Sequence, residues 1–312
     1  MLAALTLPDG TACEISYQEW GAENARVLFC VHGLTRNGMD FEKLALAAAS
    51  KGFRVIAPDM PGRGKSPRLA NPLLYNNMVN ANLCIQLLAK LGITRVDWVG
   101  TSMGGLIAFL VANQLPGLIQ KLVLNDVGCV VPAASLTRIG QYVGVSPNHA
   151  TFAETEAALK LRTQAFAIPD ADWPRFAENS IEQVPEGFRL AYDPAIAQAF
   201  ALMPPKDIEL WPLWKAVKKI PTLLIRGATS DLLLEGTAVQ MQATHPNLTR
   251  TNVANAGHAP ALMTEEEINA VLEFLCQPQS ASGSAASAHQ FSLKIQWPGW
   301  KKLWLRARQY WS

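Results

Sequence analysis

Short apolar runs alternate with segments of helical periodicity along most of the 312-residue chain. The apolar runs predict strands over residues 3–7, 12–20, 26–31, 54–57, 96–99, 121–125, 222–226 and 251–253. The helical periodicity predicts helices over residues 41–50, 77–91, 104–114 and 265–275. Because this alternation requires crossover connections, we expect an α/β fold with a mostly parallel central sheet flanked by helices.

After the sixth predicted strand the strand pattern fades, and helical pieces such as 152–166 and 194–203 replace it. This stretch lies between two strands of the predicted sheet. Residues 132–205 are therefore expected to form a helical cap, or lid, over the carboxyl edge of the sheet. The α/β core then comprises residues 1–131 and 206–278.

The character of the chain changes again at its end, where residues 279–312 are predicted to form a flexible linker and a basic, aromatic tail. In residues 291–312 the aromatic and basic side chains fall at helical spacing on different faces. Such a helix suits a peripheral contact with an anionic membrane or with a protein. The alternatives are that it folds back onto its own domain or is disordered.

Charge and cysteine content narrow the function classes further. The formal net charge of +2 gives no strong field, so nucleic acid is not expected as a partner. The five cysteines show no spacing typical of a metal site, and the N-terminus lacks the basic region of a signal peptide. We therefore expect a cytoplasmic protein, at the inner face of a membrane if the tail binds there.

A nucleophile is indicated by the sequence Gly100-Thr101-Ser102-Met103-Gly104, which fits G-x-S-x-G. A predicted strand precedes it directly and a predicted helix follows it. A sharp turn between strand and helix exposes the serine oxygen above the sheet, and the glycines keep side chains out of the crowded space. We therefore predict that Ser102 is the catalytic nucleophile, the alternative being an inert Gly/Ser turn.

A serine hydroxyl needs a base, and the base needs a carboxylate to orient it. His258 is the predicted base because it lies in a loop between the last strand and the closing helix. Asp231 follows the strand at 222–226 and gives the chain order Ser, Asp, His, so it is the favoured acid. Asp126 follows the strand at 121–125 and is the rival, interpreted as bracing the start of the insertion.

Oxyanion stabilisation is expected from two backbone amides, those of Leu34 and Met103. Leu34 follows His32-Gly33 at the end of a buried strand, where the glycine allows the backbone to turn its amides toward the nucleophile. We interpret His32 as a residue that shapes this loop and does not transfer protons.

Three features together resemble the α/β-hydrolase fold superfamily: His32-Gly33 after a strand, the Ser102 turn, and the order Ser102, Asp231, His258. Residues 59–66, DMPGRGKS, are similar to the D-x-x-G-x-G-x-S segment of the branch with esterases, enol-lactonases and C–C bond hydrolases. Epoxide hydrolases and haloalkane dehalogenases of that branch have an aspartate at the nucleophile position. The serine here makes their chemistry unexpected.

The resemblance implies a serine hydrolase that needs neither a metal nor an organic cofactor. We predict cleavage of a small-molecule carboxylic ester with a small or medium apolar acyl or alcohol group, through an acyl-enzyme. The alternatives are a lactonase or C–C bond hydrolase with the same triad and, less expected, a silent ligand-binding module. Arg36, just after the oxyanion strand, is a candidate for binding a substrate carboxylate, or else for a surface salt bridge.

Overall fold

The computed structural model describes residues 1–203 and 205–278 and is built on one eight-stranded sheet. The sheet order is β1-β2-β4-β3-β5-β6-β11-β12, and the six strands from β4 to β12 run parallel. The antiparallel β1 and β2 complete one side. The strands are β1 Leu2–Thr6, β2 Ala12–Trp20, β3 Arg26–Val31, β4 Phe53–Pro58, β5 Val96–Thr101, β6 Ile119–Asn125, β11 Thr222–Gly227 and β12 Leu248–Val253. The predicted α/β class and parallel sheet are thus confirmed.

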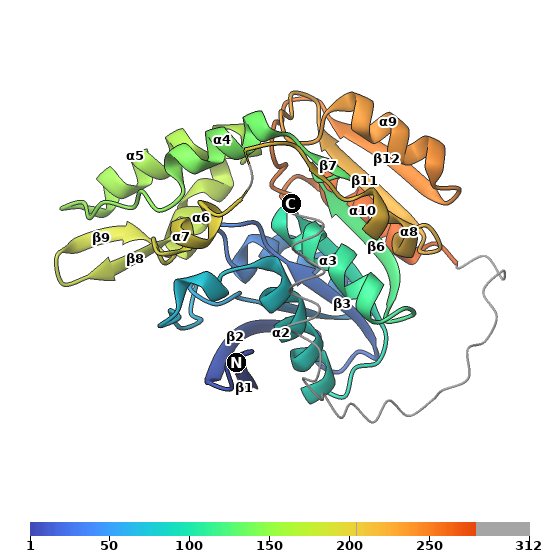
Figure 1. Cartoon of the computed structure of the whole chain (residues 1–312), viewed down its shortest axis with the longest axis horizontal. Coiled ribbons are helices and arrows are strands. Elements are labelled where there is room, and N and C mark those ends of the chain that lie inside the picture. Colours follow the sequence, from blue (N-terminus) through green and yellow to red (C-terminus); the bar gives the residue numbers. More distant parts are fainter. Residues whose placement is uncertain (204, 279–312) are drawn as a thin grey trace.

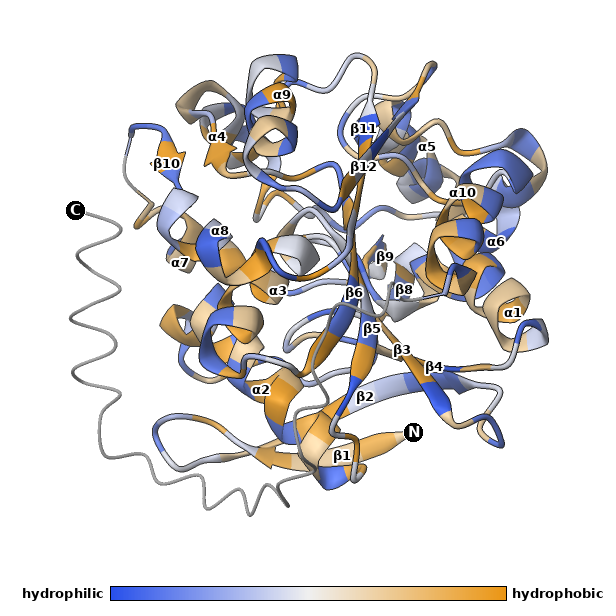
Figure 2. Cartoon of the chain, turned by 90° about the vertical axis from the view of Figure 1, so that its right-hand side faces the viewer, coloured by the Kyte–Doolittle hydropathy of each residue, from blue (hydrophilic) through white to orange (hydrophobic). Residues whose placement is uncertain are grey.

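Helices cover both faces of the sheet, as Figure 2 shows with the sheet seen edge on. One face carries α1 (Glu42–Ser50) and α10 (Glu265–Cys276), which pack on a cluster of buried strand residues. The other face carries α2 Asn77–Lys90, α3 Met103–Gln114, α8 Trp211–Val217 and α9 Glu235–Thr244. The short 3-10 helices η1 Gly38–Phe41 and η2 Pro72–Leu74 lie in loops. Strands such as β3 are buried on both sides, which explains why their sequences are almost continuously apolar.

The chain between β6 and β11 leaves the sheet and projects to one side of the core (Figure 1). Two short strands that pair with each other, β7 (Val130–Val131) and β10 (Ile208–Glu209), flank the projecting part. Between them lie α4 Ala133–Tyr142, α5 Phe152–Thr163, η3 Gln164–Phe166, η4 Asp170–Asp172, α6 Trp173–Ser180, β8 Ile181–Val184, β9 Gly187–Leu190 and α7 Ile196–Phe200. We call this segment, residues 132–205, the cap. The β8–β9 hairpin was not expected, because its short strands lack a clear alternating pattern.

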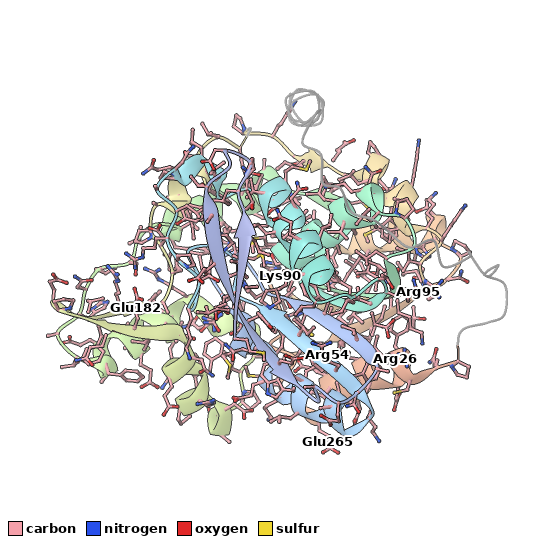
Figure 3. The ribbon with its side chains drawn as sticks, turned by 90° about the horizontal axis from the view of Figure 1, so that it is seen from below. Arg26, Arg54, Lys90, Arg95, Glu182 and Glu265 are labelled. Carbon is pink, nitrogen blue, oxygen red and sulfur yellow. The ribbon has the colours of Figure 1, made fainter. Side chains whose placement is uncertain are left out.

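Charged side chains at the amino edge of the parallel strands are paired with one another. Arg26 and Arg54 lie close together at the starts of β3 and β4 (Figure 3). Arg26 forms a salt bridge with the buried Asp97, and Arg54 with Glu19. Both arginine charges are therefore balanced by a carboxylate.

The predicted linker and tail, residues 279–312, lie outside the described residues. Within the part that is described, no helix is long and apolar enough to cross a membrane.

Candidate active site

Ser102 stands at a sharp turn between β5 and α3, as the sequence predicts. Its backbone has φ of 51° and ψ of −111°, in a region that side chains other than glycine rarely adopt. The glycines on either side permit the close approach. A Cβ on Gly100 would come within 2.5 Å of the main chain of Gly104, and one on Gly104 within 1.9 Å of the Val31 carbonyl oxygen. The turn therefore requires glycine at both positions.

This crowding predicts the effect of Gly104→Ala. Because α3 has to move away from β3 to admit the methyl group, we expect a loss of about 1–3 kcal/mol of unfolding free energy. For a chain of this size that lowers the melting temperature by roughly 2–10 °C, measurable by thermal unfolding. Gly236→Ala in α9 is the control, because nothing lies within 4 Å of its Cβ position. Equal melting temperatures for the two variants would contradict the prediction.

His258 is brought to Ser102 from the loop after β12. Its Nε2 lies 2.9 Å from Ser102 Oγ, within hydrogen-bonding distance. Its Nδ1 lies 2.7 Å from Asp126 Oδ2. An imidazole whose Nδ1–H donates to a carboxylate keeps Nε2 free to accept the proton of the serine hydroxyl. The three side chains are thus connected in the order a serine nucleophile needs.

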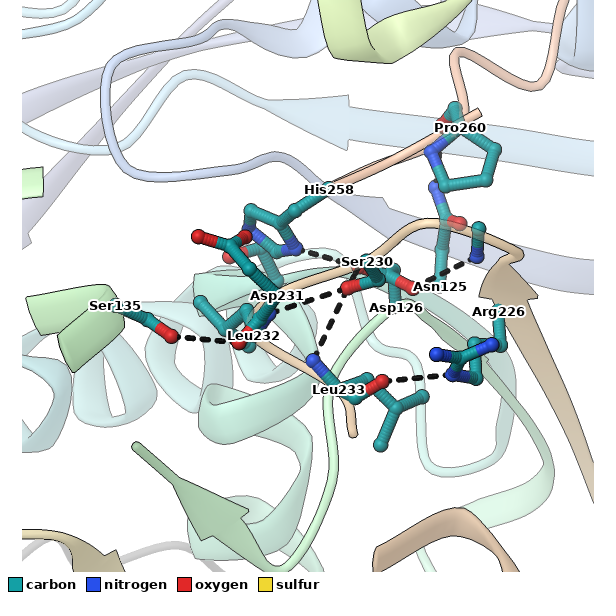
Figure 4. A network of polar contacts seen from close by, with 12 residues as sticks. Asn125, Asp126, Ser135, Arg226, Ser230, Asp231, Leu232, Leu233, His258 and Pro260 are labelled. Carbon is teal, nitrogen blue, oxygen red and sulfur yellow. Dashed lines mark hydrogen bonds and ion pairs between the residues drawn. The ribbon is translucent and has the colours of Figure 1, made fainter. Parts of the chain in front are cut away.

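Asp126 is completely buried and well supplied with donors (Figure 4). Its Oδ1 accepts from the backbone N–H of Gly227 at 2.8 Å, and its Oδ2 accepts from Ser230 Oγ at 2.5 Å. The residue has a φ of 55°, a left-handed conformation that aspartate tolerates better than most residues. These bonds fix the carboxylate in the orientation that meets His258.

The prediction that Asp231 orients His258 is wrong. Asp231 is half-exposed, and its carboxylate accepts two hydrogen bonds from Arg138 of the cap at 2.5 and 2.9 Å. The physical reason lies in the tight turn after β11, where Ser230 N donates to the Gly227 carbonyl. This turn directs Ser230, and not Asp231, toward the Asp126 carboxylate. Because β6 lies between β5 and β11 in the sheet, its end is also nearer the nucleophile strand.

Two supports of the histidine loop were not found from the sequence. Asn125 donates to Thr101 Oγ1 at 3.1 Å and to the Pro260 carbonyl at 2.8 Å, which ties β5, β6 and the loop together. The cap holds the loop on both sides of the histidine. Gly257 N donates to the Ala165 carbonyl at 2.7 Å, and Ala261 N donates to the Phe166 carbonyl at 3.0 Å. Both carbonyls belong to η3.

The predicted oxyanion amides lie in the loop after β3 (Leu34) and at the start of α3 (Met103). Gly33, the residue before Leu34, lies close to the nucleophile, because a Cβ added to it would be 4.0 Å from Ser102 Cβ. Among residues 1–203 and 205–278, no acceptor is recorded for the Leu34 or Met103 amide. Their role stays a prediction. The Leu34 carbonyl accepts from the buried Arg63 guanidinium at 2.9 Å, which fixes the loop.

His32 shapes this loop by bonding at both ring nitrogens. Its Nδ1 lies 2.7 Å from the Gly33 carbonyl oxygen, and its Nε2 accepts from the Met60 amide at 2.9 Å. Burial lowers the pKa of His32 to about 3, so the ring is neutral near pH 7. These contacts agree with the structural interpretation of His32.

Two adjoining cavities lie between the core and the cap. One of about 70 Å³ is lined by Ser102 and His258 together with apolar side chains such as Phe166, Phe176 and Met263. The other, of about 260 Å³, also reaches His258 and extends under α4 and α5. We call the second the outer cavity. Both are bounded by Thr35, Arg36, Tyr142, Phe166 and His258.

Arg36 lines both cavities, but its charge is already paired. It donates to Asp40 at 2.8 and 2.6 Å and to Ser180 Oγ at 2.8 Å, and it lies over the Phe176 ring. Of the two predicted roles, the structure records the salt bridge, although the pair is largely buried and not at the surface. An arginine neutralised in this way is a poor anchor for a substrate carboxylate.

Comparison with known proteins identifies the family to which this fold belongs. A family model for the alpha/beta hydrolase fold matches residues 26–262. The chain belongs to the α/β-hydrolase family. In the described part of this α/β-hydrolase, no group of three or more His, Cys, Asp or Glu side chains is placed to hold a metal ion.

Several relatives of this α/β-hydrolase are themselves named as hydrolases. The 3-hydroxybutyrate-oligomer hydrolase of Cupriavidus necator is 36% identical over 271 residues, which cover 83% of this chain and 92% of that protein. A 2-hydroxy-6-oxononadienedioate/2-hydroxy-6-oxononatrienedioate hydrolase of Burkholderia vietnamiensis is 34% identical over 128 residues, covering 40% and 44% of the two chains. A solved structure of a putative hydrolase from Rickettsia typhi superimposes with a TM-score of 0.80 at 33% identity, covering 86% and 92%.

Proposed function

We propose that the protein hydrolyses carboxylic esters at Ser102 through an acyl-enzyme. The observation that carries the proposal is the unbroken hydrogen-bonded series from Ser102 Oγ through His258 to the buried Asp126. Ser102 acts as nucleophile, His258 as general base and acid, and Asp126 as the carboxylate that holds the histidine. The amides of Leu34 and Met103 are the proposed oxyanion donors.

The reaction follows from these positions. Ser102 Oγ attacks the ester carbonyl carbon while His258 Nε2 takes its proton, and the carbonyl oxygen becomes an oxyanion. Asp126 stabilises the imidazolium that forms. Collapse of the intermediate breaks the ester C–O bond, and the histidine passes its proton to the departing alcohol. A water molecule then attacks the acyl-enzyme, again losing its proton to His258, which releases the acid and restores Ser102.

The proposed substrate is a short oligoester or a simple ester of a hydroxy acid. The Cupriavidus necator relative, which covers most of the chain, is a hydrolase of 3-hydroxybutyrate oligomers by its name. The lining of the outer cavity supports a substrate with polar groups, because it includes Thr35, Thr163 and Thr229 besides its arginines. The smaller cavity at Ser102 has apolar lining side chains such as Phe166 and Met263, which suit the predicted small or medium apolar group. A C–C bond hydrolase is the second candidate, favoured by the partial match to the Burkholderia vietnamiensis protein.

Labelling with a fluorophosphonate probe and an ester assay test the proposal together. We expect the full chain to label at Ser102, with no labelling of Ser102→Ala, and to release acid from p-nitrophenyl butyrate and 3-hydroxybutyrate dimer. Activity on a vinylogous 1,5-diketone but on neither ester would instead favour the C–C bond hydrolase. A folded protein that resists the probe and hydrolyses none of these compounds would refute the proposal and support a binding module.

We further propose that the cap acts as the lid of the site and that the protein works in the cytoplasm. A contact between residues 291–312 and an anionic membrane is a separate proposal, based on the basic and aromatic sequence alone. Flotation with phosphatidylserine vesicles, with and without residues 279–312, tests that contact. Equal flotation of the two proteins would refute it.

A further inference from the structure

The outer cavity contains more positive charge than its own acids neutralise. Three arginines line it, one from the loop after β3 and two from the cap: Arg36, Arg138 and Arg162. Arg36 is paired with Asp40, and Arg138 is paired with Asp231. For Arg162, no carboxylate among the described residues lies within the 4.0 Å of an ion pair. One guanidinium charge in the cavity therefore has no counter-ion among residues 1–203 and 205–278.

A neutral phenol neighbours Arg162. Arg162 lies in the last turn of α5 and is half-buried. The side chain of Tyr192 is buried, and its hydroxyl donates to the Val145 carbonyl at 3.5 Å. Burial raises the pKa of Tyr192, and the neighbouring Arg162 opposes that rise. A phenol that stays neutral near pH 7 does not cancel the charge of the guanidinium beside it.

Because Arg162 is only partly exposed to solvent, it attracts an anion that enters the cavity more strongly than a fully exposed arginine does. The same cavity contains His258, so an anion bound to Arg162 belongs to a molecule within reach of the catalytic histidine. A planar guanidinium matches a carboxylate, which it binds through two parallel hydrogen bonds. The threonine hydroxyls of the cavity at Thr163 and Thr229 already donate to the carbonyls of Leu159 and Ala256, which leaves the guanidinium as the donor for the carboxylate.

We propose that Arg162 is the subsite for a free carboxylate of the substrate. The enzyme then prefers esters that end in an acid over the corresponding neutral esters. This inference rests on the proposed ester hydrolysis at Ser102. It also moves the predicted carboxylate anchor from Arg36, whose charge is used by Asp40, to a residue of the cap.

The test is a preference ratio, kcat/KM for an acid divided by kcat/KM for its neutral counterpart. One pair is 3-hydroxybutyrate dimer and its methyl ester, with the carboxylate on the alcohol side. The other is p-nitrophenyl hydrogen glutarate and p-nitrophenyl butyrate, with the carboxylate on the acyl side. We expect Arg162→Gln to lower the ratio by at least about tenfold in one pair, the value of a charge-assisted hydrogen bond. That pair identifies the side of the ester that Arg162 binds.

Two further variants make the result specific. Arg162→Lys keeps the charge and should restore part of the preference. Arg189→Gln removes another cap arginine, one that pairs with Glu182 on the β8–β9 hairpin and does not line the outer cavity, so the ratio should stay as in the wild type. A wild-type ratio near one in both pairs, or an unchanged ratio in Arg162→Gln, would overturn the inference.

Binding separates this inference from the proposed function. Titration calorimetry of the Ser102→Ala variant with 3-hydroxybutyrate dimer and with glutarate needs no turnover. Binding that Arg162→Gln abolishes supports the carboxylate subsite even if the wild type hydrolyses neither ester pair, in which case ester hydrolysis alone fails. Absence of binding of both acids would count against the subsite whatever the esterase activity.

Discussion

Replacing Ser102 with alanine should lower kcat for p-nitrophenyl butyrate at least about a thousandfold, and up to about a millionfold. The variant lacks the hydroxyl oxygen that lies 2.9 Å from His258 Nε2, where the histidine can take its proton. What activity is left comes from binding and from the oxyanion amides. Stopped-flow or steady-state release of p-nitrophenol measures the loss.

His258→Ala should be nearly as damaging, because residues that act as one unit do not contribute additively. The double variant Ser102→Ala/His258→Ala should then be little slower than either single variant. Losses that multiply in the double variant would mean that the two side chains act independently. That result would refute the proposed mechanism.

The second large effect is expected at Asp126. Asp126→Asn should lower kcat by roughly a thousand- to ten-thousandfold, because the amide no longer fixes the Nδ1–H tautomer or stabilises the imidazolium. Because the side chain is completely buried, bulk solvent does not replace the lost charge. The same p-nitrophenol assay measures the effect, with circular dichroism to establish that the variant folds.

Asp231→Asn is the matched comparison, because it makes the same change in the neighbouring loop. Its carboxylate bonds to Arg138 at the half-exposed edge of the cap, and exposed pairs of this kind contribute about 0–1 kcal/mol. We expect kcat for the neutral ester to change by no more than about fivefold. A larger loss in Asp231→Asn than in Asp126→Asn would contradict the geometry in Figure 4.

Features that depend on local chain geometry could be predicted from the sequence. The apolar run of β3 indicates a strand covered on both faces, and the glycines around Ser102 indicate a turn that no other residue type fits. The histidine could be assigned because its loop directly follows the last strand of the sheet. In each case a single short segment determines the outcome.

The acid could not be assigned in this way, because both candidates follow strands on the same edge of the sheet. The choice depends on the shape of the turn after β11, where Ser230 and not Asp231 meets Asp126. Pairing across the cap boundary is equally invisible in the sequence. Asp231 and Arg138 are 93 positions apart, and no sequence pattern near either residue indicates that they pair.

The two main-chain bonds from η3 to the histidine loop have a consequence for the working cycle. A lid that rises by lifting η3 breaks both bonds and loosens the segment that carries His258. The loop is then still tied by the bonds of His258 to Asp126 and of Pro260 to Asn125, but the imidazole is held less firmly against Ser102. The fit of the substrate beneath the cap would in this way affect the rate of the chemical step as well as binding.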